Sequence, residues 1–398
     1  MIILVINCGS SSIKYQLLDM KSDEVYDLLA KGIVEKIGLE TGRLQHTVIG
    51  KDKVVKDLPV PDHKVGMKLV LEALTDSEHG VLKSLDDIEA VGHRIVHGGE
   101  FFSSSALVNE DVMKKIEICC DFAPLHNPAH ILGIRAVQHV LPSVPQVVTF
   151  DTAFHQSIPS YAYMYGLPYD CYSKYRVRKY GAHGTSVRYV APRAADMMGK
   201  DLKDLKLIVC HLGSGASITA VKDAKSYDTS MGFSPLAGIT MATRSGDIDP
   251  SLIQHLMRVE HKSMDEMIYM LNHKSGLLGL SGISPDMRDV RESDSDRAKL
   301  ARNIFINRIV RYVGSYIAEM GGVDGIIFTA GIGEHDMGVR EAVMDAFKYM
   351  GVDPDYEANN KISEGFITKP DSKVKVMVIP TNEELMIERD VVRLTHIN

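Results

Sequence analysis

The sequence predicts an α/β protein made of two related halves, and three observations support this prediction. Short apolar segments of strand length alternate with longer amphipathic segments of helix length, which favours mixed layers of strands and helices. A strand followed by a Gly/Ser turn near the N-terminus recurs near the middle of the chain. With 398 residues, 45% of them hydrophobic, the chain is long enough to form two or three domains with their own cores.

The first predicted unit lies at the N-terminus. Residues 2–6 form a short apolar run, residues 7–12 are rich in Gly and Ser, and residues 13–18 are again β-prone. Strand, tight turn and strand is the simplest interpretation of this pattern. Residues 145–150 and 374–379 are further short apolar segments that we expect to be strands.

Helices are predicted from their start and stop signals. Asn127 followed by Pro128 is typical of an N-cap with proline at the first helical position, and this helix should end near Leu141. Residues 294–320 carry apolar side chains at helical spacing, which predicts a long amphipathic helix. This helix leads into the apolar strand predicted at residues 325–329.

An internal repeat supports the division into two halves. Residues 207–217 resemble residues 4–12, because each segment has an apolar strand, a polar residue, one further residue and then Gly-Ser. The polar residues are Asn7 and His211, and the two copies lie about half the chain apart. Two similar strand–turn units at this separation favour two related domains that face one another.

Composition excludes several classes of protein. The chain has 45 Lys and Arg against 52 Asp and Glu, a net charge of −7, which argues against a non-specific nucleic-acid binder. Five cysteines, with Cys119 and Cys120 adjacent, do not form a disulfide framework and favour the cytoplasm. We expect no signal peptide and no membrane span, because the N-terminal apolar run is short and lacks a basic leader. Neither a P-loop nor a dinucleotide fingerprint occurs in the sequence.

Three Gly-containing turns could approach a phosphate or a nucleotide. In the turns after residues 2–6 and 207–212, glycine permits close approach of backbone N–H groups, and serine hydroxyls add donors. The turn at residues 331–335 follows a predicted strand and could pass over a nucleotide sugar or base. The alternative for each is an ordinary structural turn, and only the recurrence of the first pattern favours phosphate binding.

Histidines and arginines gather in polar segments that are mostly bounded by glycine. The segments are residues 92–99, 125–127, 181–186 and 243–249. Together they indicate a convergent anion site in a chain that is acidic overall, although a buried or capping role is common for any single histidine. The spacings His93/His97 and His126/His130 would suit a metal on a helix, but neighbouring Gly and Pro residues disturb both.

Carboxylates complete the candidate set. Asp151 ends a predicted strand between apolar flanks, where a purely solvated acid is not expected. Glu383 and Glu384 stand where a helix should begin, either as functional acids or as partners of the helix dipole.

These motifs together resemble the acetate kinase family. The matching segments occur in the family's order and cover nearly the whole chain: residues 7–14, 92–99, 149–155, 183–186, 211–215, 242–247 and 380–384. The resemblance implies two duplicated actin-like (ribonuclease H-like) α/β domains with a nucleotide cleft between them. The expected boundaries are residues 1–150 plus 384–398 for the N-terminal domain and residues 151–383 for the nucleotide-binding domain.

The resemblance also implies an activity. Members of the family transfer a phosphoryl group reversibly and in line from ATP to acetate, giving acetyl phosphate and ADP, with Mg²⁺ or Mn²⁺. We therefore expect a cytoplasmic homodimer that takes acetate or a short-chain acyl substrate, without nucleic-acid or membrane partners.

Catalytic roles follow from the family at four positions. Arg94 would hold the acetate carboxylate, Arg244 would contact both the carboxylate and the transferring phosphoryl group, and His183 would donate to a phosphoryl oxygen. Asp151 occupies the family's acid–base position. Because acetate is already ionised at neutral pH, we expect Asp151 to orient an arginine or the waters of the metal.

The remaining implied contacts belong to the metal, the nucleotide and the acyl group. Asn7 and Glu383 would position Mg²⁺, chiefly through waters. The acyl methyl group would contact Val96, Leu125, Ala182 and Pro235. The nucleotide would contact Lys14, His211, Leu212, Gly213, Ser214, Gly215, Asp286, Met287, Arg288, Gly331, Ile332, Gly333, Glu334 and His335.

Two departures from the family leave the acyl specificity open. The family usually has Phe at the position of Ala182 and His at the position of Val187. Loss of an aromatic wall predicts a pocket relaxed toward propionate unless a neighbour fills the gap, since each buried CH₂ can gain about 0.8 kcal/mol. A propionate kinase is therefore one alternative. A non-catalytic nucleotide-binding scaffold of the same fold is another, which the intact phosphoryl-handling residues disfavour.

Overall fold

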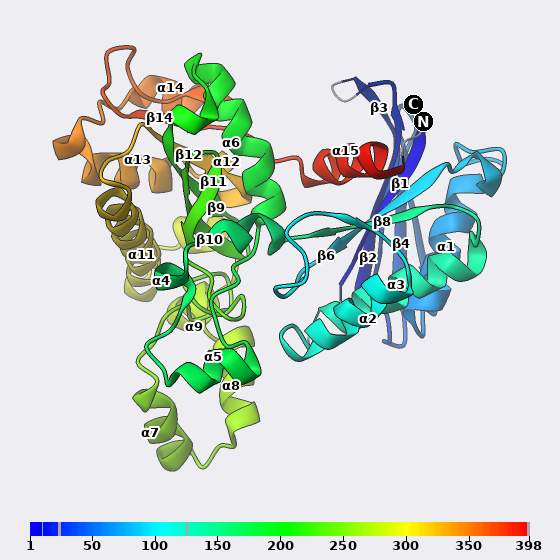
Figure 1. Cartoon of the computed structure of the whole chain (residues 1–398), viewed down its shortest axis with the longest axis horizontal. Coiled ribbons are helices and arrows are strands. Elements are labelled where there is room, and N and C mark those ends of the chain that lie inside the picture. Colours follow the sequence, from blue (N-terminus) through cyan, green and yellow to red (C-terminus); the bar gives the residue numbers. More distant parts are fainter. Residues whose placement is uncertain (10, 23–24, 125, 396–398) are drawn as a thin grey trace. The chain divides into compact units, whose positions relative to one another are not determined.

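The structure is a computed structural model that describes residues 1–9, 11–22, 25–124 and 126–395. The chain divides into two compact units (Figure 1). Unit 1 comprises Met1–Ala153 and Asn382–Asn398, and unit 2 comprises Phe154–Thr381. The boundaries expected from the sequence, after residue 150 and before residue 384, lie a few residues from these divisions.

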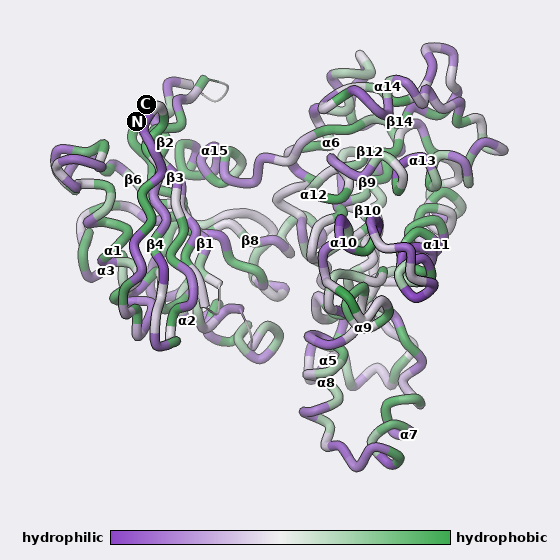
Figure 2. Tube along the Cα trace, turned by 180° about the vertical axis from the view of Figure 1, so that it is seen from behind, coloured by the Kyte–Doolittle hydropathy of each residue, from purple (hydrophilic) through white to green (hydrophobic). Residues whose placement is uncertain are grey.

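Unit 1 is built on a sheet with the strand order β5-β4-β3-β2-β1-β6-β8-β7. Strands β1 to β5 pair antiparallel with their neighbours, and β1, β6 and β8 pair in parallel. The strand bounds are β1 Ile2–Cys8, β2 Ser12–Met20, β3 Tyr26–Glu35, β4 Gly42–Val48, β5 Val54–Leu58, β6 Ala90–Ile95, β7 Ala106–Leu107 and β8 Gln146–Phe150. Burial alternates from residue to residue along β4, whereas β8 is buried throughout, and Figure 2 shows both hydrophilic and hydrophobic stretches in the strands of this unit.

Helices cover both faces of the unit 1 sheet. They are α1 His63–Thr75, α2 Glu110–Ile118, α3 Asn127–Val140 and α15 Glu383–Thr395. The core between the sheet and α1 contains Leu4, Ile6, Met67 and Leu71. On the opposite face α15 lies so close to β6 that a Cβ on Gly92 would come within 2.5 Å of Ile387, which explains a glycine in this strand.

Unit 2 repeats this plan with the strand order β11-β10-β9-β12-β14-β13. Its strands are β9 Lys206–Leu212, β10 Ala216–Lys222, β11 Lys225–Thr229, β12 Gly325–Thr329, β13 Gly365–Phe366 and β14 Lys375–Val378. Its helices are α4 Ser160–Tyr163, α5 Tyr169–Tyr175, α6 Gly184–Met198, α7 Ser251–Glu260, α8 Met264–His273, α9 Gly276–Ser281, α10 Met287–Glu292, α11 Asp296–Met320, α12 Ala330–His335, α13 Met337–Ala346 and α14 Tyr356–Lys361. The predicted long amphipathic helix is α11, which buries Ile309, Val313 and Ile317 against the sheet.

The two sheets confirm the predicted duplication. In each unit the first two strands along the chain form an antiparallel hairpin, β1–β2 or β9–β10. The first strand of this hairpin also pairs in parallel with a central strand, β6 or β12. A third parallel strand follows, β8 or β14, and carries a short antiparallel strand at its outer edge. The repeated motif that contains Asn7 and His211 therefore occupies the same place in both sheets.

Three details differ from the sequence-based expectations. Helix α3 begins with Asn127 in its first turn, its N-cap is His126, and it ends at Val140. The Asn127 side chain does not cap the helix, because it is bonded to the backbone of His97. The expected turn at residues 331–335 is the short helix α12.

Among the described residues, no helix combines the length and the apolar character needed to cross a membrane.

Candidate active site

In unit 1, Arg94 and Asp151 come together at the carboxyl ends of two parallel strands. Arg94 lies near the end of β6 and Asp151 directly follows β8, whose Thr149 is in register with Arg94. The Arg94 Nε atom donates to Asp151 Oδ1 and Oδ2 at 3.2 and 3.1 Å, and Nη2 donates to Oδ2 at 2.6 Å. The Asp151 side chain is 1% exposed and that of Arg94 is 21% exposed, so this ion pair is largely removed from water.

Glu383, at the start of α15, adds a second carboxylate to this pair. Its Oε2 lies 3.8 Å from Arg94 Nε. Burial raises the pKa of Glu383 to about 7, and repulsion from Asp151 and Glu384 adds to this rise while Arg94 and Lys14 oppose it. Burial acts to lower the pKa of Arg94, but attraction to Asp151 and Glu383 outweighs burial and raises it. Arg94 is therefore charged, and two carboxyl groups, those of Asp151 and Glu383, lie beside this single positive charge.

Two residues that the sequence analysis did not assign to the site fix the loop after β6. Asn127 accepts from His97 N at 3.2 Å, and its Nδ2 donates to His97 O at 2.9 Å. Thr152 Oγ1 accepts from Gly98 N at 3.0 Å. These bonds fix the loop that contains Val96. Val96 is 7% exposed and follows Arg94 by two positions. The sequence did single out Asn127, but its amide was interpreted as a helix cap.

In unit 2, His183 and His211 stack on one another. Their ring centroids are 4.0 Å apart and their planes differ by 20°. His183 Nδ1 is hydrogen-bonded to Ser217 Oγ at 2.9 Å, and His211 Nδ1 to Ser186 Oγ at 2.8 Å. Each imidazole is therefore bonded to a serine through Nδ1 and stacked on the other ring, which fixes its orientation.

Gly215 lies between His183 and Arg244. A Cβ on Gly215 would lie 3.5 Å from both Arg244 Nη1 and His183 Nε2, so the absence of a side chain leaves space beside both groups. The Arg244 loop is joined to the same hairpin, because Ala242 N donates to Ser214 O at 3.1 Å.

Arg244 is a partly buried cation without a carboxylate partner in the described part of the chain. Its Nη1 donates to the backbone oxygen of Pro235 at 3.2 Å, and burial lowers its pKa. A buried charge is normally paired, because removing it from water is costly. An unpaired arginine beside an oriented histidine therefore indicates a place for an anionic ligand.

A pocket of about 570 Å³ in unit 2 brings together three segments that lie far apart in the sequence. Asp286 bonds both the backbone and the guanidinium of Arg288, and these bonds lower the pKa of Asp286 to about 2. The lining residues are Gly213, Ser214, Pro285, Asp286, Met287, Arg288, Arg291, Gly331, Ile332, His335 and Asp336.

Several predicted nucleotide residues do not line this pocket. Leu212 is fully buried in the core of unit 2. Gly333 packs against the backbone of Phe328, and Glu334 Oε1 accepts from the backbone of Ala330 and Thr381 at 2.8 and 3.1 Å. His211 and Gly215 lie beside Gly213 and Ser214 in sequence without reaching the lining, and Lys14 belongs to unit 1.

The predicted acyl-pocket residues are distributed over both units. Ala182 is 3% exposed and belongs to the core of unit 2, so neighbouring side chains already surround its methyl group. The neighbouring departure from the family pattern, Val187, is fully buried in the same unit. Leu125, and Ser10 of the predicted phosphate turn, lie outside the described residues.

The described residues contain no group of three or more His, Cys, Asp or Glu side chains arranged to hold a metal ion. His93 and His97, whose spacing would suit a metal on a helix, are not on one: His93 lies on β6 and is bonded to Gln146 at 2.7 Å, in agreement with the interpretation that the neighbouring glycines disturb this candidate. Asn7 and Glu383 remain compatible with a water-mediated Mg²⁺. The excess of carboxylates around Arg94 provides the negative charge that a hard cation requires.

The duplicated sheets define an actin-like α/β protein, a fold class that includes many kinases. The chain belongs to the acetokinase family, whose model matches residues 2–389. It is 53% identical to an acetate kinase of Thermoanaerobacterium thermosaccharolyticum over 98% of this chain and 97% of that protein. Its structure is similar to the crystal structure of Porphyromonas gingivalis acetate kinase, with a TM-score of 0.94, 44% identity and 99% coverage of both chains. A propionate kinase from Francisella tularensis gives a TM-score of 0.92 and 43% identity, with 99% coverage of both chains. The family inferred from the motifs is confirmed.

Proposed function

We propose that this protein is a kinase that transfers a phosphoryl group reversibly from ATP to acetate, giving acetyl phosphate and ADP. Membership of the acetokinase family supports the reaction. The structural observation that carries the proposal is Arg244, a partly buried cation without a described carboxylate partner beside the oriented imidazole of His183.

Phosphoryl transfer requires alignment of donor and acceptor oxygens and neutralisation of the charge that spreads over the transferring group. We assign Arg244 and His183 to the oxygens of that group, since both border the space beside Gly215. An arginine that stabilises this transition state contributes about 10³ to 10⁵ in rate in comparable enzymes.

We assign Arg94 to the acetate carboxylate. The bonds to Asp151 occupy its Nε and Nη2 atoms, which leaves Nη1 for a substrate oxygen. Asp151 then acts as a positioning residue that fixes the guanidinium. A general base is unnecessary, because acetate is ionised at neutral pH and can attack phosphorus directly.

We assign the 570 Å³ pocket of unit 2 to ATP. The Gly213–Ser214 backbone would contact the phosphates, and the segments at Asp286–Arg288 and Gly331–Ile332 would border the adenosine. Mg²⁺, or Mn²⁺, would be held through waters by Asn7 and Glu383 and would screen the phosphate charges. Deprotonation of Glu383, with its pKa of about 7, would accompany cation binding.

A hydroxamate assay tests the proposed reaction. The protein is incubated with MgATP, hydroxylamine and either acetate or propionate, and acyl hydroxamate is quantified. We expect product with acetate at a higher kcat/KM than with propionate. A strong preference for propionate would favour the alternative substrate, and absence of product with tight ATP binding would favour a non-catalytic scaffold.

We also propose a cytoplasmic location and a homodimer. All five cysteines are free, which suits a reducing compartment. Light scattering of the purified chain tests the oligomeric state.

A further inference from the structure

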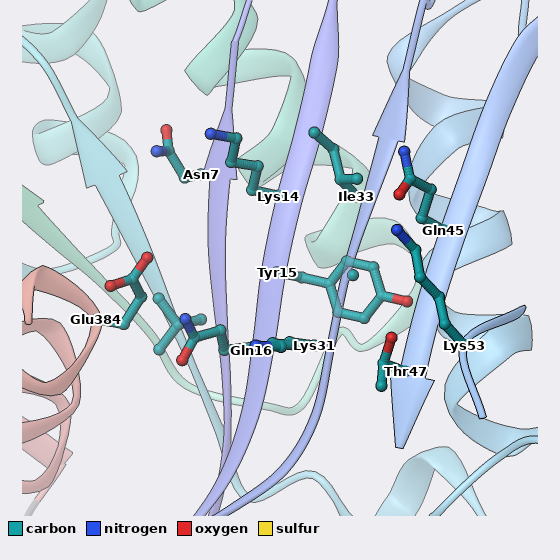
Figure 3. A pocket seen from close by; sticks show the side chains of 12 residues that line it. Asn7, Lys14, Tyr15, Gln16, Lys31, Ile33, Gln45, Thr47, Lys53 and Glu384 are labelled. Carbon is teal, nitrogen blue, oxygen red and sulfur yellow. The ribbon is translucent and has the colours of Figure 1, made fainter. Parts of the chain in front are cut away.

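Unit 1 contains a cavity of about 380 Å³ that the proposed reaction uses only at one end (Figure 3). Helix α15 packs on the same face of the sheet, over β6, as the contact of Gly92 with Ile387 shows. The cavity lies beyond this helix, over β1 to β4. Asn7, Lys14 and Glu384 lie toward one end of it, and Gln45 and Lys53 toward the other.

The strand register explains why several long polar side chains meet on this face. Lys31 pairs with Gln16 on β2 and with Thr47 on β4, so these three side chains form one row across the sheet. Lys14 and Gln45 form the adjacent row through Ile33. Because neighbouring strands are about 4.8 Å apart and each residue advances the strand by about 3.4 Å, lysines in adjacent rows can reach one anion between them.

Three lysines border the cavity: Lys14, Lys31 and Lys53. Lys53 directly precedes β5 and lines the same cavity as Gln45 (Figure 3). No carboxylate of the described chain lies within 4 Å of these three ammonium groups. Other exposed lysines, such as Lys115 and Lys174, do have carboxylate partners one helical turn away.

The acidic groups near the cavity locate its positive end. Glu384 lines the end that contains Asn7 and Lys14. Glu35 does not line the cavity, but it accepts from Gln45 Nε2 at 3.2 Å, so that amide is already engaged. Lys31 and Lys53 both border the part of the lining away from Glu384, and Thr47, which pairs with Lys31, adds a hydroxyl donor there.

We propose that the part of the cavity between Lys31 and Lys53 binds a small anion that carries at least two negative charges on phosphoryl groups. This site is separate from the nucleotide pocket of unit 2. The volume is in the range of small-molecule sites, and ammonium groups on flexible arms suit phosphate oxygens, whose positions vary between ligands. Because the lysines are exposed, binding should weaken steeply with added salt. This proposal does not depend on the proposed acetate kinase reaction.

Calorimetric titration with inorganic pyrophosphate tests the proposal. The whole protein is used without Mg²⁺ and with saturating ADP, so that the nucleotide pocket is filled in every sample. We compare the wild type with the double variant Lys31→Ala/Lys53→Ala. The charge-matched control is Lys56→Ala/Lys64→Ala: Lys56 pairs with the core residue Leu44 and faces the other side of the sheet, and Lys64 lies on α1.

We expect the wild type and the control to bind one more pyrophosphate per chain than Lys31→Ala/Lys53→Ala, or to bind it at least tenfold more tightly. We also expect this difference to shrink as NaCl is raised from 50 to 300 mM. Thermal unfolding verifies that both double variants are folded. Equal binding by all three proteins, or equal loss in the control, would overturn the proposal. If ADP failed to bind, the proposed function would be in question, but the comparison of the variants would still be valid.

Discussion

The two arginines of the candidate site have opposite environments, and their substitution should have opposite effects on stability. Arg94 is paired with a buried carboxylate, so Arg94→Ala removes the ion pair with Asp151 and should cost about 3 kcal/mol of unfolding free energy. Arg244 has no carboxylate partner in the described chain, so Arg244→Ala removes an uncompensated charge and should leave stability unchanged or raise it. Urea denaturation of both variants measures this contrast.

Arg244→Ala should nevertheless abolish most of the activity. If Arg244 stabilises the transferring phosphoryl group, kcat should fall by about 10³ or more while ATP still binds. Hydroxamate kinetics and ATP titration of the same preparation separate the two effects. A variant that turns over at the wild-type rate would remove Arg244 from the mechanism.

Ser217 is a positioning residue whose substitution should affect rate more than binding. Its hydroxyl is bonded to His183 Nδ1, so Ser217→Ala removes one of the contacts that orient the imidazole. We expect kcat to fall by about 10- to 100-fold with little change in the KM for ATP. Ser226→Ala is the matched control, because Ser226 is equally buried and bonded to His155 Nδ1 at 2.8 Å. If both variants lost the same fraction of kcat, the effect would be structural.

At the scale of elements, helix α15 contributes one residue to the site and one titratable group to stability. Glu383 begins the helix beside Arg94, whereas Glu388 is fully buried and neither carboxylate oxygen has a hydrogen-bond partner within the described chain. Burial, with a smaller contribution from Glu384, raises the pKa of Glu388 to about 9. The folded protein therefore retains a proton there that the unfolded chain has already lost at neutral pH.

This proton makes a testable pH dependence. Protonated Glu388 makes its full contribution to the free energy of unfolding below about pH 4.5, the pKa of this group in the unfolded chain. The contribution decreases by about 1.4 kcal/mol per pH unit as the pH rises from there toward about 9. Glu388→Gln lacks this loss, so its stability advantage over the wild type should grow by about 2 to 3 kcal/mol between pH 6.5 and 8.5. Comparing the variant with the wild type at each pH removes the contribution of other groups that titrate in this window, such as Glu383. Urea denaturation at each pH measures the difference, and Glu117→Gln, on the exposed face of α2, is the control. A constant difference across the window would show that Glu388 is ionised.

The sequence predicted those elements whose signals are local. Apolar runs beside Gly/Ser turns identified the hairpins β1–β2 and β9–β10, and helical spacing identified α11. Asn127 was misinterpreted because one amide can either cap a helix or bond to a distant loop, and only the tertiary structure distinguishes these roles. Ser217 was overlooked as a positioning residue, although it is in register with His211 across the β9–β10 hairpin. The burial of Glu388 could not be predicted, because it depends on strands more than 200 residues away.

At the scale of the whole molecule, the candidate site residues form two sets that belong to different units and to different segments of the chain. The pocket assigned to ATP, together with His183 and Arg244, belongs to the contiguous segment of unit 2. Arg94, Asp151 and Glu383 belong to unit 1, which is assembled from both ends of the chain. Each unit has its own sheet and its own hydrophobic core. The residues assigned to the acetate carboxylate and to the phosphoryl group therefore belong to different units, whereas the lining of the pocket assigned to ATP belongs to unit 2 alone.

This separation predicts that residues 154–381, expressed alone, bind ATP without producing acetyl phosphate. The segment contains a complete sheet and two clusters of buried side chains, so it should unfold cooperatively. We expect its Kd for ATP in the absence of Mg²⁺ to lie within about tenfold of that of the whole chain, because every residue lining the pocket is present. Circular dichroism establishes folding before calorimetry measures binding. The same segment with Gly213→Val is the control, since a branched side chain at this position would enter the pocket lining. A folded segment that does not bind ATP would mean that unit 1 supplies essential nucleotide contacts, and Lys14 would then be the first residue to test.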